Sequence, residues 1–295
     1  MTARKPGHRF FIVDVFGEGR YSGNQLAVVL PAGKMPDAEM QRIALEFNFP
    51  ETTFLGGLRP RKGAYAVRIF TPRREIPFAG HPTLGTAYLI RKLLAPKAKE
   101  IRLDLKAGRI PVRFDNASGL LWMKLLAPAF GKIHEPKAVA KVLGLAARDI
   151  DARFPIQSVS TGLEFLLVPL KGLAAVKKAC TDLPAYRKYF TGKGGLPIFL
   201  FSPETYDPAN RINARMFAEA FGIPEDPATG SANGCLAGYL VKHAYFGPGP
   251  VHARVEQGYE MGRKSILHLE ARTKGRGIDV RVGGKVFEVA EGMLR

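Results

Sequence analysis

The chain has 295 residues, of which 46% are hydrophobic and 24% charged, as in a globular protein with room for about two domains. No apolar run has the length of a membrane span, and residues 1–6 lack the apolar core of a secretory signal, so we expect a cytoplasmic protein without membrane partners. The net charge of +18 comes from basic residues spread along the chain, without a basic stripe, which favours solvated surface over a nucleic-acid interface.

The first half of the chain predicts short strands and two helices. Met40 and Phe47 belong to a set of apolar residues at helical spacing, with Asp37 as the expected N-cap and Pro50 ending the segment. A second helix is expected from Pro82 to about residue 93. The expected strands cover residues 10–15, 26–30, 51–55, 65–70, 101–105, 109–114 and 120–125.

The second half also predicts short strands and helices. It begins after residues 127–131 (APAFG), which we interpret as a linker. One helix is expected around residues 139–143, and another from Ser231, as N-cap, to about His243. The last expected strands cover residues 251–257, 265–271, 278–282 and 285–290. Because strands predominate and connections are short, we predict an α+β fold with mainly antiparallel sheets wrapped around a central helix in each half.

Two glycine turns are the most informative feature: residues 80–85 (GHPTLG) and 226–234 (DPATGSANG). Each follows a strand-like run and opens a helix-like run, and their first glycines, Gly80 and Gly230, are 150 positions apart. A helix N-terminus at a glycine turn presents free N–H groups that suit a small anion such as a carboxylate. An ordinary pair of glycine turns is the alternative for either turn taken alone.

The similarity between the halves extends beyond these turns. Residues 67–70 and 214–217 each place an arginine before an aromatic residue, and residues 22–29 are similar to residues 161–168. We therefore expect two domains related by a pseudo-twofold axis, with limits at residues 1–128 and 129–280.

The two cysteines and six histidines show no metal-ligand spacing, so we expect no metal site. Cys180 and Cys235 lie in different contexts, and we expect reduced thiols.

A set of motifs in fixed order resembles the PhzF family of phenazine-biosynthesis isomerases and their relatives. The motifs, which span essentially the whole chain, are Gly23-Asn24, Glu51-Thr52-Thr53-Phe54, Phe70-Thr71-Pro72, Glu75, Gly80-His81-Pro82-Thr83 and Asp226-Pro227-Ala228-Thr229-Gly230-Ser231-Ala232. The resemblance implies a diaminopimelate epimerase-like fold of two similar domains, each a barrel-like sheet around a helix. It also implies an active site in the cleft between them, a return of residues 281–295 to the first domain, and a homodimer.

Glu51 is the first candidate for catalysis. It follows Pro50 and lies between Phe49 and Phe54, and apolar surroundings raise the pKa of a carboxyl group toward the working pH. In the resembling enzyme, the equivalent glutamate moves a hydrogen between ring carbons of trans-2,3-dihydro-3-hydroxyanthranilate without a cofactor. The alternative is a surface glutamate at a strand end. The family often has serine before this glutamate, so Pro50 puts any substrate contact from that position in doubt.

His81 and Asp226 are the second-tier catalytic candidates, one at each glycine turn. His81 could bind substrate or relay a proton, and Asp226 could anchor an amino group, although both could instead be helix caps. Diaminopimelate epimerase has cysteines at the two turns, so two-thiol racemase chemistry is not expected here. The expected substrate-binding residues are Gly80, Gly230, Ser231 and Asn24.

We therefore expect a cofactor-independent isomerase or epimerase that acts on a small carboxylate or amino-acid-like substrate. Within enzymes, the alternative is a racemase-like activity with Glu51 as the one clear base. From other classes, the alternatives are a family member that acts through protein partners with a vestigial pocket, and a basic nucleic-acid binder.

Overall fold

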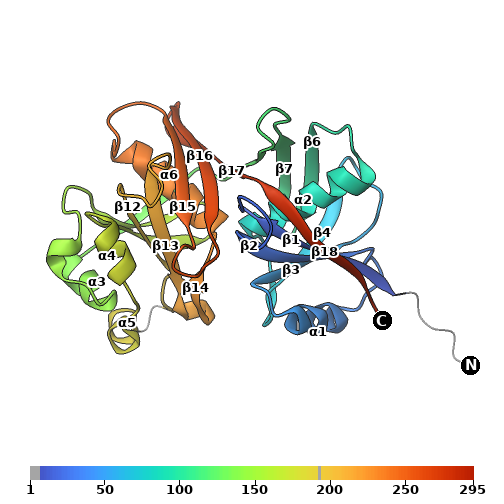
Figure 1. Cartoon of the computed structure of the whole chain (residues 1–295), viewed down its shortest axis with the longest axis horizontal. Coiled ribbons are helices and arrows are strands. Elements are labelled where there is room, and N and C mark those ends of the chain that lie inside the picture. Colours follow the sequence, from blue (N-terminus) through green and yellow to red (C-terminus); the bar gives the residue numbers. More distant parts are fainter. Residues whose placement is uncertain (1–6, 192–193) are drawn as a thin grey trace, which may run out of the picture. The chain divides into compact units, whose positions relative to one another are not determined.

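The computed structural model describes residues 7–191 and 194–295, which form extensive β-structure with few helices (Figure 1). Two compact units are distinguished by their internal contacts. The N-terminal unit contains the residues up to Lys124 together with Gly283–Arg295, and the C-terminal unit contains Leu125–Val282. No helix in the described part of the chain is long and apolar enough to cross a membrane.

The N-terminal unit is built from short strands and two helices, close to the elements expected from apolar spacing. Its helices are α1 (Asp37–Phe47) and α2 (Gly80–Leu94). Its strands are β1 (His8–Val15), β2 (Asn24–Leu30), β3 (Glu51–Leu55), β4 (Tyr65–Phe70), β5 (Glu75–Ile76), β6 (Glu100–Leu105), β7 (Gly108–Phe114), β8 (Leu121–Lys124) and β18 (Val286–Leu294).

The C-terminal unit has more helices than the sequence analysis predicted. They are α3 (Pro136–Val142), α4 (Leu173–Lys178), α5 (Leu183–Tyr189) and α6 (Gly230–Lys242). The strands are β9 (Ala129–His134), β10 (Ile156–Ser160), β11 (Glu164–Pro169), β12 (Ile198–Ser202), β13 (Ile212–Ala218), β14 (Ile223–Asp226), β15 (Val251–Gln257) and β16 (Ser265–Lys274). Strand β17 (Gly277–Gly284) leads from this unit into the N-terminal one.

Both units follow one order of strand pairing. In the N-terminal unit, β2 pairs parallel with β3 after α1, and β4 pairs parallel with β6 after α2. In the C-terminal unit, β11 pairs parallel with β12 after α4 and α5, and β13 pairs parallel with β15 after α6. Antiparallel pairs connect the intervening strands, such as β3 with β4 and β12 with β13. A helix crosses over each parallel pair because parallel neighbours need a long connection.

Strands β1 and β10 each have a further antiparallel partner. The C-terminal strand β18 pairs along the whole of β1, from His8 opposite Leu294 to Val15 opposite Val286. In the other unit, β9 pairs with β10. The interpretation of residues 127–131 as a linker is therefore wrong from Ala129 onward. Gly131 serves close strand approach, because a Cβ atom there would lie 2.6 Å from Ser158 Oγ.

Two predicted helix caps are also wrong. The N-cap before α1 is Pro36, and Asp37 is the first helical residue, with its carboxylate accepting a hydrogen bond from Arg68. The N-cap before α6 is Thr229, and Ser231 lies inside the first turn. Short polar residues suit the cap chemically, but the extended backbone that defines a cap falls one or two residues earlier in both cases.

An arginine on β4 and another on β13 hold the hairpins that lead to the two glycine turns. Arg68 on β4 makes a bidentate pair with Glu75 of β5 at 2.8 and 2.9 Å. Arg215 on β13 makes the same pair with Glu225 of β14, at 2.8 Å for both bonds. Because such fork-like pairs fix geometry, they orient the strand that delivers the chain to each turn.

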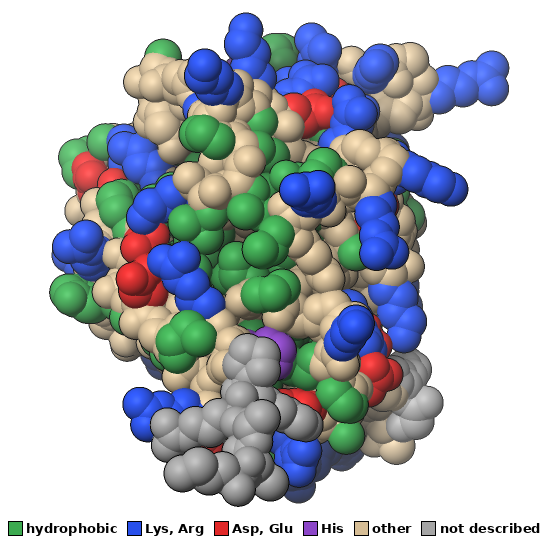
Figure 2. Space-filling view, turned by 90° about the vertical axis from the view of Figure 1, so that its right-hand side faces the viewer, with side chains coloured by type: hydrophobic (Ala, Val, Ile, Leu, Met, Phe, Trp, Pro, Cys, Tyr) green, Lys and Arg blue, Asp and Glu red, His purple; other side chains and the backbone are tan. Residues whose placement is uncertain are grey.

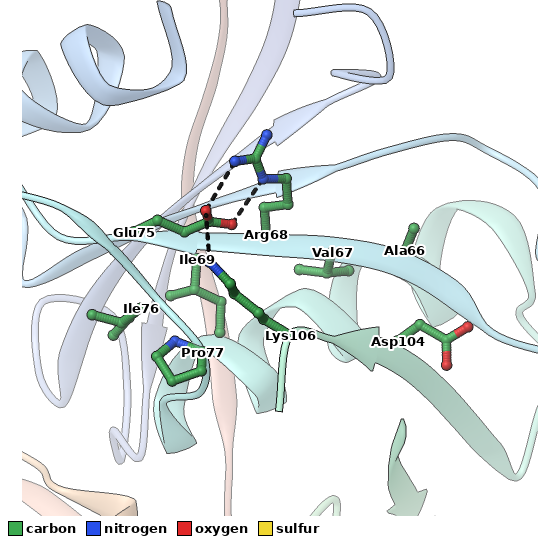
Figure 3. Close-up of a pocket in the computed structure, with 9 residues that line it drawn as sticks. All are labelled: Ala66, Val67, Arg68, Ile69, Glu75, Ile76, Pro77, Asp104 and Lys106. Carbon is green, nitrogen blue, oxygen red and sulfur yellow. Dashed lines mark hydrogen bonds and ion pairs between the residues drawn. The ribbon is translucent and has the colours of Figure 1, made fainter. Parts of the chain in front are cut away.

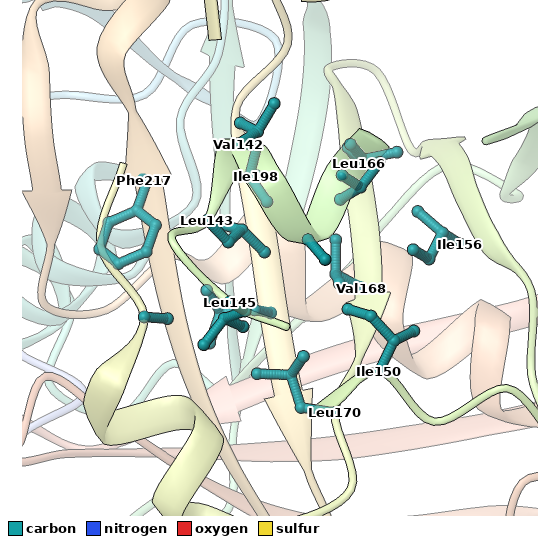
Figure 4. Packing of buried hydrophobic residues seen from close by; sticks show 14 of the residues in the cluster. Val142, Leu143, Leu145, Ile150, Ile156, Leu166, Val168, Leu170, Ile198 and Phe217 are labelled. Atoms are coloured by element: carbon teal, nitrogen blue, oxygen red, sulfur yellow. The ribbon is translucent and has the colours of Figure 1, made fainter. Parts of the chain in front are cut away.

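Apolar side chains form a core within each unit. In the N-terminal unit, a cluster joins Val29, Met40, Phe54 and Phe70, so α1 packs on the sheet. In the C-terminal unit, the helices α3, α4 and α5 bury their apolar faces against β11 and β12 (Figure 4). The labelled members of that cluster are Val142, Leu143, Leu145, Ile150, Ile156, Leu166, Val168, Leu170, Ile198 and Phe217.

Candidate active site

A carboxyl group and an imidazole face each other in the N-terminal unit. Glu51 is the first residue of β3, and His81 lies in the first turn of α2. Glu51 Oε2 and His81 Nε2 are 3.3 Å apart, and the side chains are only 14% and 6% exposed. Two of the three predicted catalytic residues are therefore in contact, although thirty positions separate them in the chain.

The close approach of α2 to the sheet places His81 beside Glu51. Gly85, one turn into the helix, sits against β1 and β2, where a Cβ atom would lie 2.6 Å from Leu26 Cδ2 and 2.9 Å from Val15 Cγ2. Leu26 is itself the parallel partner of Glu51 in the sheet. A small residue at position 85 is thus required for the helix to start over the beginning of β3.

Burial keeps His81 neutral. Loss of hydration lowers its pKa to about 3, and a backbone hydrogen bond with Gln25 opposes this shift only in part. Since Nε2 faces Glu51, the bond with Gln25 is assigned to Nδ1, which then carries the ring proton. The pair is therefore a carboxyl group facing the lone pair of a neutral imidazole. Such a pair can hold one proton, on the carboxyl oxygen, and release it.

The second glycine turn holds a buried aspartate in the C-terminal unit. Asp226, only 7% exposed, ends β14 just before α6. The Thr229 hydroxyl donates a short hydrogen bond to Asp226 Oδ2, and Gln257 Nε2 donates to the Asp226 backbone oxygen at 2.8 Å. A carboxylate supported in this way can bind a donor such as an amino group.

Both glycine-turn helices begin without a side-chain cap. The N-cap residues are Ala79 for α2 and Thr229 for α6, and neither side chain bonds to the first turn of its helix. Neither first turn contains an acidic residue. Gly80 and Gly230 are buried at these starts, so uncapped N–H groups and the positive helix end are available for an anion.

Asn24 and Cys235 occupy buried supporting positions. Asn24, fully buried at the start of β2, lies opposite Val15 of β1. Burial raises the pKa of the Cys235 thiol to about 12, so this thiol is protonated and unreactive at neutral pH. Cys180 is exposed, and both cysteines are free.

The predicted site residues fall in both units. Glu51, His81, Gly80 and Asn24 belong to the N-terminal unit, and Asp226, Gly230 and Ser231 belong to the C-terminal unit. Gln25 and Gln257 were not among the site residues predicted from the sequence. Thr229 could have been found, because it lies inside the second turn motif, but no sequence signal links Gln257 to a turn 28 residues away.

A pocket of about 250 Å³ in the N-terminal unit lies apart from these residues (Figure 3). Its charged groups are engaged in ion pairs, since Arg68 forms a bidentate pair with Glu75, Lys106 lies 3.6 Å from Glu75, and Asp104 pairs with Arg109 at 2.7 Å. None of the predicted site residues lines it. We assign it to the structural hairpin of β4 and β5.

Lys and Arg side chains appear at many separate places on the face shown in Figure 2, among hydrophobic and other side chains. Several cations of the N-terminal unit are paired, for example Arg109 with Asp104 at 2.7 Å and Arg113 with Glu100 at 3.0 Å. On this face the positive charge of the described residues is therefore spread over many separate places and is not gathered in one basic patch.

The fold of the chain is similar to folds of solved structures. It is similar to hydroxyproline epimerase from Agrobacterium vitis, with a TM-score of 0.63 at 12% identity over 98% of this chain and 91% of that one. At that identity the likeness concerns the fold alone. A family model described as phenazine biosynthesis-like protein, PhzC-PhzF, matches residues 13–292. The chain therefore belongs to the PhzF family, and the predicted resemblance is confirmed.

Curated relatives and solved structures agree with this assignment. The chain is 32% identical over 293 residues to trans-2,3-dihydro-3-hydroxyanthranilate isomerase from Pseudomonas fluorescens, covering 97% of this chain and 99% of the relative. It is 31% identical to an uncharacterized isomerase from Deinococcus radiodurans, covering 98% and 95%. The PhzF-family phenazine biosynthesis protein from Bacillus anthracis superposes with a TM-score of 0.89 at 26% identity, covering 99% and 100%. The chain is thus an isomerase of the PhzF family.

Proposed function

We propose that this isomerase moves a hydrogen between two carbons of a small carboxylate substrate, with Glu51 as both base and acid. The observation that carries the proposal is the 3.3 Å contact between a buried carboxyl group and a neutral imidazole. A carboxylate in this place can take a proton, and His81 Nε2 can then accept a hydrogen bond from the protonated carboxyl group.

The proposed reaction needs no change of oxidation state. A carbon–hydrogen bond of the substrate breaks as its proton moves to Glu51, and the electron pair shifts along the adjacent double bonds. The proton then leaves Glu51 and forms a new carbon–hydrogen bond at another carbon. Since atoms and electrons balance within one substrate molecule, the step requires no external oxidant, reductant or redox cofactor.

The substrate class follows from the two glycine turns and from the relatives. Free N–H groups at Gly80 and Gly230, with the Ser231 hydroxyl, suit a carboxylate, and Asp226 suits an amino group. Asn24, fully buried at the start of β2, is the further binding residue that we propose. Trans-2,3-dihydro-3-hydroxyanthranilate, named for the Pseudomonas fluorescens relative, carries both groups, so we propose it or a close analogue as substrate.

The decisive variant is Glu51→Gln, which keeps the shape and removes the base. With trans-2,3-dihydro-3-hydroxyanthranilate in deuterated water, the wild type should place deuterium on a product carbon, reduced by any internal return of the original hydrogen. Glu51→Gln should lower turnover about 10²–10⁴-fold, the usual contribution of general acid–base catalysis. Glu46→Gln, on the exposed surface of α1, is the matched control and should behave as wild type.

A Glu51→Gln variant with near-normal turnover would remove Glu51 from the proposed role. Asp226→Asn tests the binding half of the proposal and should raise KM as well as lower kcat. The buried carboxyl–imidazole contact itself argues against a vestigial site, because an unneeded buried carboxyl group costs stability.

A further inference from the structure

Gln257, the last residue of β15, forms hydrogen bonds through its side-chain amide with several residues of the second glycine turn. The side chain is fully buried. Nε2 donates to the Asp226 backbone oxygen at 2.8 Å and to Thr229 Oγ1 at 3.1 Å. Oε1 accepts from the Thr229 backbone N–H at 3.2 Å and from Asn233 Nδ2 at 3.1 Å. Both ends of one amide are therefore committed to the segment that carries Asp226.

These bonds fix the direction of the Thr229 hydroxyl. A backbone N–H can only donate, so the atom of Gln257 that meets Thr229 N must be the oxygen, and the atom that meets Thr229 Oγ1 must be the nitrogen. Because the hydroxyl accepts from Gln257, its single hydrogen is directed to Asp226 Oδ2. The result is a one-way chain of donors from Gln257 through Thr229 to the carboxylate.

The Thr229 hydroxyl bonds to Asp226 instead of capping α6. It occupies the N-cap position of α6, where a threonine hydroxyl commonly accepts a bond from the first turn, yet no such bond is formed. The hydroxyl instead donates to a carboxylate that is itself 7% exposed. A hydrogen bond donated to a carboxylate favours its charged form and holds the plane of the group.

We propose that Thr229 and Gln257 are positioning residues, which hold the Asp226 carboxylate aimed at the amino group of the substrate. This inference rests on the proposed function, because that function assigns the amino group to Asp226. The inference adds a source of substrate specificity. Because Thr229 and Gln257 orient Asp226, the site should bind substrates that carry an amino group beside the carboxylate more tightly than substrates that lack it.

Anthranilate and benzoate test this selection, since they differ only in the amino group. We expect wild type to bind anthranilate more tightly than benzoate in calorimetric titration. Thr229→Val removes the hydroxyl at constant shape and should reduce that preference about tenfold or more, the effect of losing a hydrogen bond to a charged group. Thr229→Ser should keep the preference, and benzoate binding should stay unchanged in both.

Gln257→Leu should have the effect of Thr229→Val, with Gln157→Leu as its matched control. Gln157 is another buried glutamine of the same unit, and it bonds to the Gly131 carbonyl at 3.0 Å and to His243 at 2.9 Å. If Gln257→Leu does not fold, the Thr229 variants alone decide the question.

An unchanged preference in Thr229→Val, or no preference in wild type, would overturn the inference. The proposed proton transfer is judged separately, by turnover of trans-2,3-dihydro-3-hydroxyanthranilate in Glu51→Gln. If Thr229→Val loses the preference for anthranilate while Glu51→Gln keeps normal turnover, the proposed proton transfer is rejected and the positioning role of Thr229 stands.

Discussion

Mild acid should destabilise the protein through His81, and this prediction tests the electrostatics of the site without a substrate. Burial lowers the pKa of His81 from 6.5 to about 3. Between these two values, the unfolded chain carries a proton on the imidazole and the folded chain does not. The free energy of unfolding must therefore fall as the pH drops below 6.5, and the effect levels off near pH 3. Above pH 7 the ring is neutral in both states and adds no pH dependence.

The size of the effect follows from the width of this window. Each pH unit inside it is worth about 1.4 kcal/mol for one proton, so the interval from pH 6.5 to 5 costs about 2 kcal/mol. His81→Asn cannot take up a proton and should lack this part of the pH dependence. Burial also lowers the pKa of His243, but that residue is present in both proteins, and its contribution cancels in the comparison.

The assay is denaturant unfolding of wild type and His81→Asn at pH 7.5 and pH 5. Wild type should lose about 2 kcal/mol more than the variant over this range. Equal losses would show that the folded protein already holds the proton on His81, as an ion pair with Glu51. The reasoning from a neutral imidazole would then be refuted.

Packing and thiol chemistry give two further tests. Gly85→Val should lower the free energy of unfolding by about 2 kcal/mol or more, because a side chain there collides with Leu26 and lifts α2 from the sheet. In the control Gly57→Ala, the added Cβ atom has no neighbour within 4 Å, and the free energy of unfolding should change by less than about 0.5 kcal/mol. With a disulfide reagent at pH 8, only the exposed Cys180 should react in the folded protein, whereas Cys235, with its pKa raised to about 12, should react only after unfolding. Fast labelling of two thiols in the folded state would contradict the burial of Cys235.

The sequence alone determined the features that depend on neighbouring residues. Alternation of apolar residues located most strands of the N-terminal unit, and glycine turns located the starts of α2 and α6 at Gly80 and Gly230 within two residues. The ordered motifs determined the family. Errors arose where composition suggested a local role that packing changed. The segment from Ala129 contains proline and glycine neighbours typical of a linker, yet it pairs with β10, and Asp37 bonds to Arg68 instead of capping its helix.

The tertiary structure decided which of the candidate side chains meet. Glu51 and His81 come together because β2 and β3 pair in parallel register and because Gly85 lets α2 lie directly on β1 and β2. The low pKa of His81 depends on how much water the assembled fold removes, which no local pattern encodes. Gln257 reaches the Asp226 turn only after β15 has paired beside β13. Local propensities act over a few residues, whereas these contacts join segments tens of residues apart, so only packing of the whole unit could specify them.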